Sequence, residues 1–151
     1  MPAMGRSMRP WIPDDSTVEI RKPMDDAYRL GDIVLLQQAG MLKIHRIIGM
    51  RMENEKRQYL CKGDASSQAD GFIPAENIWG RVVSIRIGGP IGDRIGGRIG
   101  RLNVSPDGFY LRPFMVLQAL ISPYSASYAP LLSFMKRMVM GLIHFLKKFS
   151  V

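Results

Sequence analysis

Short runs that alternate between apolar and polar residues dominate the first part of the chain, as in residues 17–22. Such alternation puts the apolar side chains on one face and is typical of β-strands. We predict strands at residues 17–22, 33–37, 42–50, 58–62 and 79–87, a polar loop at 65–71 and one short helical turn at 75–78. Short strands separated by turn-forming residues at this spacing predict a mainly β, antiparallel domain.

The C-terminal part of the chain has a different pattern. Residues 88–108 are rich in glycine and arginine and predict a basic linker. Residues 109–151 are apolar, and within them Leu131 to Phe149 repeats with helical spacing, with basic residues largely on the other side. This pattern predicts a basic amphipathic helical tail, suited to packing on the β domain, lying in a membrane surface or docking a partner. We therefore expect a β domain at 1–87, a linker at 88–108 and a tail at 109–151.

Composition narrows the class of protein. The 151 residues are 46% hydrophobic and 23% charged, which suits one globular domain. The net charge of +8 favours an anionic partner. The single cysteine, Cys61, excludes an internal disulfide and a zinc site of the Cys-pair type, and nothing in the sequence suggests a metal or an organic cofactor.

Two features of the sequence bear on location. Residues 1–10 lack the apolar stretch that a secretory signal needs. Pro123 and Pro130 interrupt the uncharged stretch of the tail, which makes it a poor candidate for a membrane-spanning helix. We expect a membrane-associated or cytoplasmic protein without a clear transmembrane helix.

Four residues are candidates for chemistry: Ser7, His45, Asp64 and Asp70. A serine hydroxyl is a weak nucleophile that needs an adjacent base, and imidazole suits that task near neutral pH. A carboxylate on the other ring nitrogen fixes the tautomer of the histidine. Taken singly, each residue also has a structural interpretation, namely a loop serine, a strand histidine and two turn-forming aspartates.

Several short motifs carry these candidates in a fixed order. They are Ser7-Met8-Arg9-Pro10, Gly31-Asp32-Ile33-Val34, His45-Arg46-Ile47, Lys62-Gly63-Asp64-Ala65 and Asn77-Ile78-Trp79-Gly80-Arg81-Val82. In order and approximate spacing they resemble the boxes of the type I signal peptidase family. The histidine resembles the base of the endoplasmic-reticulum and archaeal-type branch, whereas most bacterial members and the related self-cleaving repressor peptidases have lysine there.

The resemblance implies a fold, an activity and residue roles. It implies a signal-peptidase-like antiparallel β domain and a serine endopeptidase that cleaves a leader or signal segment, with Ser7 as nucleophile and His45 as general base. For the acid that orients His45 it favours Asp70, while Asp64 would order the loop. The expected partner is a peptide or protein substrate with small residues before the cut, with a membrane surface available to the C-terminal helix.

The sequence also leaves alternatives open. Family members usually carry a transmembrane helix just before the serine box, which is absent from this sequence, so we favour a dedicated leader peptidase over general signal removal. Lys43 lies on the same side of its predicted strand as His45 and is an alternative base. A catalytically inactive module that binds a peptide, a membrane or nucleic acid is a second class of function, with nucleic acid the least favoured partner.

Overall fold

The fold is described from a computed structural model of the whole chain. The structure describes residues 1–2, 5–9, 11–14, 16–24, 27–87, 102–106 and 112–121, together with Arg137 and Gly141. Apart from those last two residues, the amphipathic helix predicted at 131–149 lies outside the described residues, and so does most of the predicted linker.

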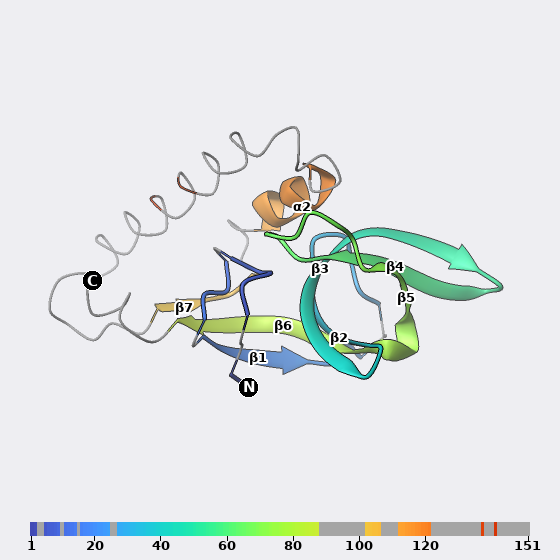
Figure 1. Ribbon diagram of the computed structural model, residues 1–151, viewed down its shortest axis with the longest axis horizontal. Helices are drawn as coiled ribbons and strands as arrows, with labels where there is room; N and C mark the ends of the chain where they lie inside the picture. The colour runs from blue at the N-terminus through green and yellow to red at the C-terminus, as the bar shows by residue number, and fades with distance from the viewer. Residues whose placement is uncertain are drawn as a thin grey trace, which may run out of the picture.

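One antiparallel sheet forms the body of the protein (Figure 1). Its strands are β1 (Thr17–Arg21), β2 (Ile33–Gln38), β3 (Met41–Glu53), β4 (Lys56–Lys62), β5 (Gly71–Pro74), β6 (Ile78–Ile87) and β7 (Leu102–Val104). The spatial order is β1-β6-β2-β3-β4-β5, and β7 pairs with β6. The mainly β, antiparallel fold class predicted from the sequence is therefore confirmed.

Two tight hairpins place β3 at the centre of this arrangement. The turn between β2 and β3 has φ of 49° at Ala39 and 77° at Gly40, and the turn between β3 and β4 has φ of 50° at Asn54 and 61° at Glu55. Positive φ at both central residues matches the right-handed twist of the flanking strands, which sets the register of the hairpins. In that register Val34 lies opposite His45, and Arg46 lies opposite Lys62.

Two short elements were not predicted as such from the sequence. The first is the strand β5, which begins at the last residue of the expected polar loop. The 3-10 helix that follows it, Ala75–Asn77, lies where a helical turn was expected. The strand β7 lies within residues 88–108, the expected linker, and its Val104 pairs with Ile85 of β6. Part of that region therefore extends the sheet.

A helix, α2 (Arg112–Ile121), packs on the sheet next to β3 (Figure 1). Met115 and Ala119 are fully buried, and Met115 belongs to the same apolar cluster as Trp11 and Ile33. At Gly31, just before β2, φ is +87° and a β-carbon would lie 3.0 Å from the backbone carbon of Met115, so the helix approaches the chain too closely there for a larger residue.

Polar contacts also hold α2 against the sheet domain. Arg112 forms an ion pair with the fully buried carboxylate of Asp32, and Trp11 Nε1 donates a hydrogen bond of 2.7 Å to Gln118 Oε1. This part of the expected tail is thus integrated with the β domain. Among the described residues, no helix combines the length and the apolar character needed to cross a membrane.

Candidate active site

Ser7 lies in a turn that is anchored by its apolar neighbours. Met8, Trp11 and Ile12 are each at most 5% exposed and belong to the core, and the backbone N–H of Ile12 donates a hydrogen bond of 3.0 Å to the carbonyl of Met8. Burial of the residues after Ser7 fixes the backbone of the turn while the Ser7 side chain stays partly accessible. The hydroxyl therefore projects from a rigid support, although it comes from a loop.

The segment after β4 holds the backbone of Ser7 from the other side. The Ala65 N–H donates a hydrogen bond of 2.7 Å to the Ser7 carbonyl. A β-carbon placed on Gly63 would lie 2.9 Å from both the β-carbon and the carbonyl oxygen of Ser7, closer than such atoms pack. The Lys62-Gly63-Asp64-Ala65 motif therefore has a local physical role, since glycine lets the two segments touch and Ala65 fastens them.

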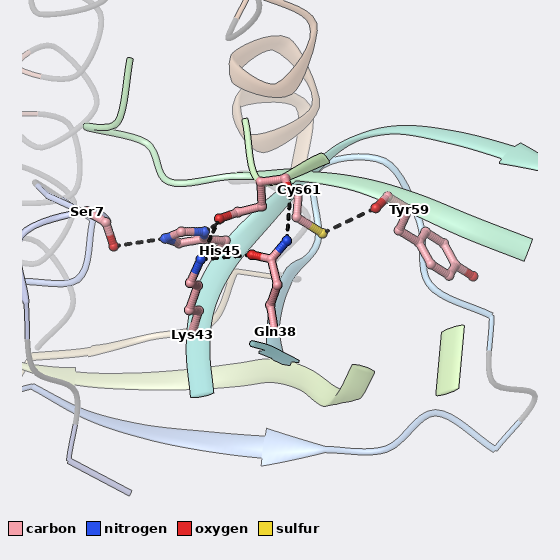
Figure 2. A network of polar contacts seen from close by, with 7 residues as sticks. Ser7, Gln38, Lys43, His45, Tyr59 and Cys61 are labelled. Atoms are coloured by element: carbon pink, nitrogen blue, oxygen red, sulfur yellow. Dashed lines mark hydrogen bonds and ion pairs between the residues drawn. The ribbon is translucent and has the colours of Figure 1, made fainter. Parts of the chain in front are cut away.

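His45 lies between Ser7 and Asp70, and each of its ring nitrogens has a partner (Figure 2). His45 Nε2 is 3.1 Å from Ser7 Oγ, and His45 Nδ1 is hydrogen-bonded to Asp70 Oδ2. An ionised carboxylate can only accept, so with neutral imidazole Nδ1 donates to Asp70 and Nε2 is left to accept the Ser7 hydroxyl proton. The structure thus brings together three of the four predicted site residues in the order serine, histidine, acid.

Asp70 is held in the loop that leads from β4 into β5. Its N–H donates a hydrogen bond of 2.8 Å to the Cys61 carbonyl, and its side chain is 9% exposed. Burial acts most strongly on the carboxyl and would raise its pKa, but hydrogen bonds and opposite charge from His45 and then Lys43 outweigh it, so the pKa of Asp70 is lowered. Because its pKa is lowered, the carboxyl group of Asp70 is ionised near neutral pH and can accept a hydrogen bond from His45.

Lys43 and Gln38 complete the surroundings of Asp70 (Figure 2). Lys43 Nζ lies 3.1 Å from Asp70 Oδ1 and donates a hydrogen bond of 2.8 Å to Gln38 Oε1. Lys43, the alternative base considered from the sequence, is thus paired with the carboxylate of Asp70. The side chain in contact with the Ser7 hydroxyl is that of His45. The predicted placement of Lys43 and His45 on one side of the strand holds, because both reach Asp70.

Asp64, the other candidate acid, has a different partner. Its two carboxylate oxygens accept hydrogen bonds of 2.8 and 2.7 Å from Nε and Nη2 of Arg46. The side chains of Arg46 and Asp64 are 0% and 1% exposed, so this is a sealed, two-pronged ion pair. Because both ring nitrogens of His45 are already engaged, Asp64 is not the residue that orients the imidazole.

A pocket of about 290 Å³ opens beside the Ser7–His45 pair. Apart from Ser7, His45 and Lys43, its wall is largely apolar and includes Pro2, Met8, Ile12, Leu35, Leu42 and Ile44. An apolar pocket with a few convergent polar groups is the usual form of a ligand site. The arrangement can receive an uncharged side chain next to a hydroxyl that has a base in contact with it.

The nearby thiol offers no competing nucleophile. Burial, and to a lesser degree the charge of Asp70, raises the pKa of Cys61 to about 12, so the thiol stays protonated and unreactive. Within the described part of the chain, no group of His, Cys, Asp and Glu side chains gathers as a metal site.

Sequence reasoning did not assign roles to Gln38, Arg46 or Gln118. For Arg46 a signal existed, since a basic residue next to His45 on a predicted strand must face the other way and, in a buried strand, needs an acid. Gln38 and Gln118 make their contacts through the tertiary fold, and their sequence neighbourhoods give no hint of it. Comparison of the chain with protein-family models, with curated proteins and with solved structures finds no match in any of the three.

Proposed function

We propose that the protein is a serine endopeptidase of the signal-peptidase type, which cleaves a leader or signal segment from a peptide or protein. The observation that carries the proposal is the continuous contact from Ser7 Oγ through His45 to the buried carboxylate of Asp70. A hydroxyl, a base and an orienting acid in this arrangement are the parts that nucleophilic acyl transfer requires. The motif resemblance, which rests on separate residues as well, points to the same chemistry.

The first half of the reaction forms an ester on Ser7. Ser7 Oγ attacks the carbonyl carbon of the scissile peptide bond while His45 Nε2 accepts the hydroxyl proton, and the carbonyl electron pair moves onto oxygen. Collapse of this tetrahedral species breaks the carbon–nitrogen bond, and the leaving amine takes the proton from Nε2. Asp70 stays ionised throughout and stabilises the imidazolium that forms between the two steps.

The second half releases the new carboxyl end. Water attacks the ester carbon and gives a proton to His45 Nε2, and collapse then breaks the bond to Ser7 Oγ, which takes that proton back. In both halves negative charge develops on the former carbonyl oxygen. The resemblance implies that backbone N–H groups at or next to Ser7 donate to this oxygen. One such donor is worth about 10²–10³ in rate.

The pocket gives the substrate a place beside the serine. Its wall is formed by apolar residues of the segment around Ser7 and of β3. An extended substrate chain lying between these two segments would turn one side chain into the pocket and bring the next carbonyl to Ser7. The resemblance favours a small side chain at that position, and substrates of graded side-chain size test the point directly.

An active-site serine probe tests the proposed function. The full-length protein is incubated with a fluorophosphonate in the presence of detergent or vesicles, and the adduct is mapped by intact mass and peptide mass spectrometry. We compare wild type with Ser7→Ala and with Ser67→Ala, an exposed serine in the same loop region as Asp64. Thermal unfolding of each variant verifies that it is folded.

We expect an adduct on Ser7 in wild type and in Ser67→Ala, and none in Ser7→Ala. Cleavage of a peptide library by wild type alone, with new termini read by mass spectrometry, would then define the substrate. Folded wild-type protein that forms no adduct and cuts no peptide overturns the proposal. That result favours the alternative function, an inactive module that binds a peptide, a membrane or nucleic acid.

A further inference from the structure

The carboxylate of Asp70 has a second cationic partner that the reaction described above does not use. Asp70 Oδ2 bonds His45 Nδ1, while Asp70 Oδ1 lies 3.1 Å from Lys43 Nζ. Lys43 Nζ in turn donates 2.8 Å to Gln38 Oε1, and Gln38 Nε2 donates 2.7 Å to the backbone carbonyl of Asp70. Asp70, Lys43 and Gln38 therefore form a closed ring of polar contacts, in which Figure 2 labels Lys43 and Gln38.

This ring determines how the carboxylate is oriented. Each carboxylate oxygen has its own donor, so the plane of the carboxyl group cannot rotate without breaking a charge-assisted hydrogen bond. Gln38 fixes the Asp70 backbone at the same time and holds the ammonium group of Lys43 in place. Lys43 and Gln38, which contact Asp70 away from His45, therefore hold Asp70 Oδ2 in the direction of the imidazole.

The charges around Asp70 come from a small set of groups. His45 and Lys43 approach from β3 and Gln38 from β2, and β4 contributes the Cys61 carbonyl and its protonated thiol. Lys43 is thus the permanent cation at this carboxylate among the described residues. Its side chain is 29% exposed and that of Asp70 only 9%, so water screens the pair incompletely.

A fixed cation at Asp70 has a consequence for the base. The negative charge of the carboxylate stabilises protonated imidazole, and a neighbouring ammonium group offsets part of that stabilisation. Lys43 therefore offsets part of the field that the Asp70 carboxylate exerts on the ring of His45.

We propose that Lys43 and Gln38 are positioning residues of the catalytic unit, which orient Asp70 and set the acidic limit of the reaction. The proposal rests on the proposed serine peptidase function. It assigns Lys43 to the acid, and not to the role of general base that the lysine branch of the resembled family would suggest. It also gives a reason for the contact of Asp70 Oδ1 with Lys43, in addition to the contact of Asp70 Oδ2 with His45.

The test is the pH dependence of serine labelling in full-length protein. The rate of adduct formation with the fluorophosphonate is measured from about pH 5 to about pH 9. The variants are Lys43→Met, Lys43→Arg and Gln38→Leu. Lys56→Met is the matched control. Lys56 is an exposed lysine at the start of β4 that also has an acidic partner, since its Nζ lies 3.8 Å from Glu76 Oε1. Thermal unfolding is recorded for every variant.

Lys43→Met should move the acidic limb of the rate profile up by about one pH unit, so that labelling within that limb falls about tenfold. Lys43→Arg keeps the charge and should keep the limb in place. Gln38→Leu should lower the plateau rate without moving the limb, because it removes orientation but no charge. Lys56→Met should match wild type in both respects.

Four results would overturn the proposal. The first is a Lys43→Met limb that coincides with that of wild type. The second is loss of labelling at every pH in Lys43→Met while His45→Ala is still labelled, which would make Lys43 the base. Should Lys43→Met not fold, a shifted limb in Lys43→Arg or a wild-type plateau in Gln38→Leu decides against it. Folded wild-type protein that is not labelled and cuts no peptide is a separate outcome and refutes the proposed function itself.

Discussion

Asp64 and Asp70 lie in the same connection between β4 and β5, yet they have opposite environments. Asp64 is sealed against Arg46, with both oxygens occupied by one guanidinium group and 1% of the side chain exposed. Asp70 divides its oxygens between His45 and Lys43, and both of these residues line an open pocket. Guanidinium stays protonated in proteins, whereas imidazole exchanges its proton near neutral pH. The partner therefore decides which aspartate can support a group that transfers protons.

The strand β3 creates this difference through its alternation. His45 and Arg46 are consecutive, so their side chains leave the strand on opposite faces. His45 points to the face where Ser7 and the pocket lie. Arg46 points to α2, where it also donates to the Gly31 carbonyl at 3.0 Å and contacts Met115 Sδ at 2.9 Å. One dipeptide thus supplies both the proposed base and the anchor of the loop that supports Ser7.

The largest difference between the two aspartates should appear in activity. Asp70→Asn leaves the geometry intact but lets the amide favour the wrong imidazole tautomer, a change that lowers the rate about 10⁴-fold in a serine triad. Fluorophosphonate labelling at neutral pH measures the loss, with Asp64→Glu as the comparison that keeps the charge. An Asp70→Asn protein that is labelled at the wild-type rate would remove Asp70 from the chemistry.

Stability should rank the two aspartates the other way round. Asp64→Ala leaves the guanidinium of Arg46 buried without its carboxylate and should lower the free energy of unfolding by about 3–5 kcal/mol. Asp70→Asn should cost clearly less, since its partners reach the pocket surface. Chemical denaturation measures both. The double variant Arg46→Met/Asp64→Leu should recover much of the loss, and equal costs for the two single variants would contradict the comparison.

The contact of the loop with Ser7 should affect activity more than stability. In Gly63→Ala the new β-carbon would lie 2.5 Å from Ser66 Oγ and 2.9 Å from the Ser7 carbonyl oxygen. The Ser66 side chain can rotate away, but the contact with the backbone of Ser7 requires Ser7 to shift. Displacement of a reacting group by about 1 Å can cost about 10²-fold in rate. Gly49→Ala is the control, because its β-carbon would meet only Leu60, at 3.4 Å. Equal labelling rates in the two variants would show that Ser7 tolerates the shift.

The smallest effect should be seen in acid. Because the folded state lowers the pKa of Asp70, its ionised form stabilises the fold above the unfolded pKa of about 3.9, and this stabilisation is lost as the pH falls through the folded value. The difference in unfolding free energy between wild type and Asp70→Asn should therefore shrink as the pH drops below about 4. Urea denaturation across this range measures it, and a difference that grows in acid would reverse the assigned sign.

Much of the fold could be predicted from the alternation of residues alone. The run at residues 33–37 corresponds to β2 (Ile33–Gln38), and that at 42–50 to the longer β3 (Met41–Glu53). The strands β5 and β7 were not predicted because four and three residues are too few to show a period. The helix α2 lies within residues 109–151, where a helical tail was predicted, but its bounds were not predicted, because its buried Met115, Gln118 and Ala119 lie in an almost uncharged segment that shows no polar face.

By itself the sequence determined the antiparallel β class, the strand that carries His45 and the set of chemically capable residues, because these depend on local alternation and on side-chain type. Only the tertiary structure decided which residues meet. It brings Ser7 to His45, gives Asp70 and not Asp64 to the imidazole, and seats Gln118 on Trp11. Such contacts depend on the packing of segments distant in sequence, and local periodicity carries no information about that packing.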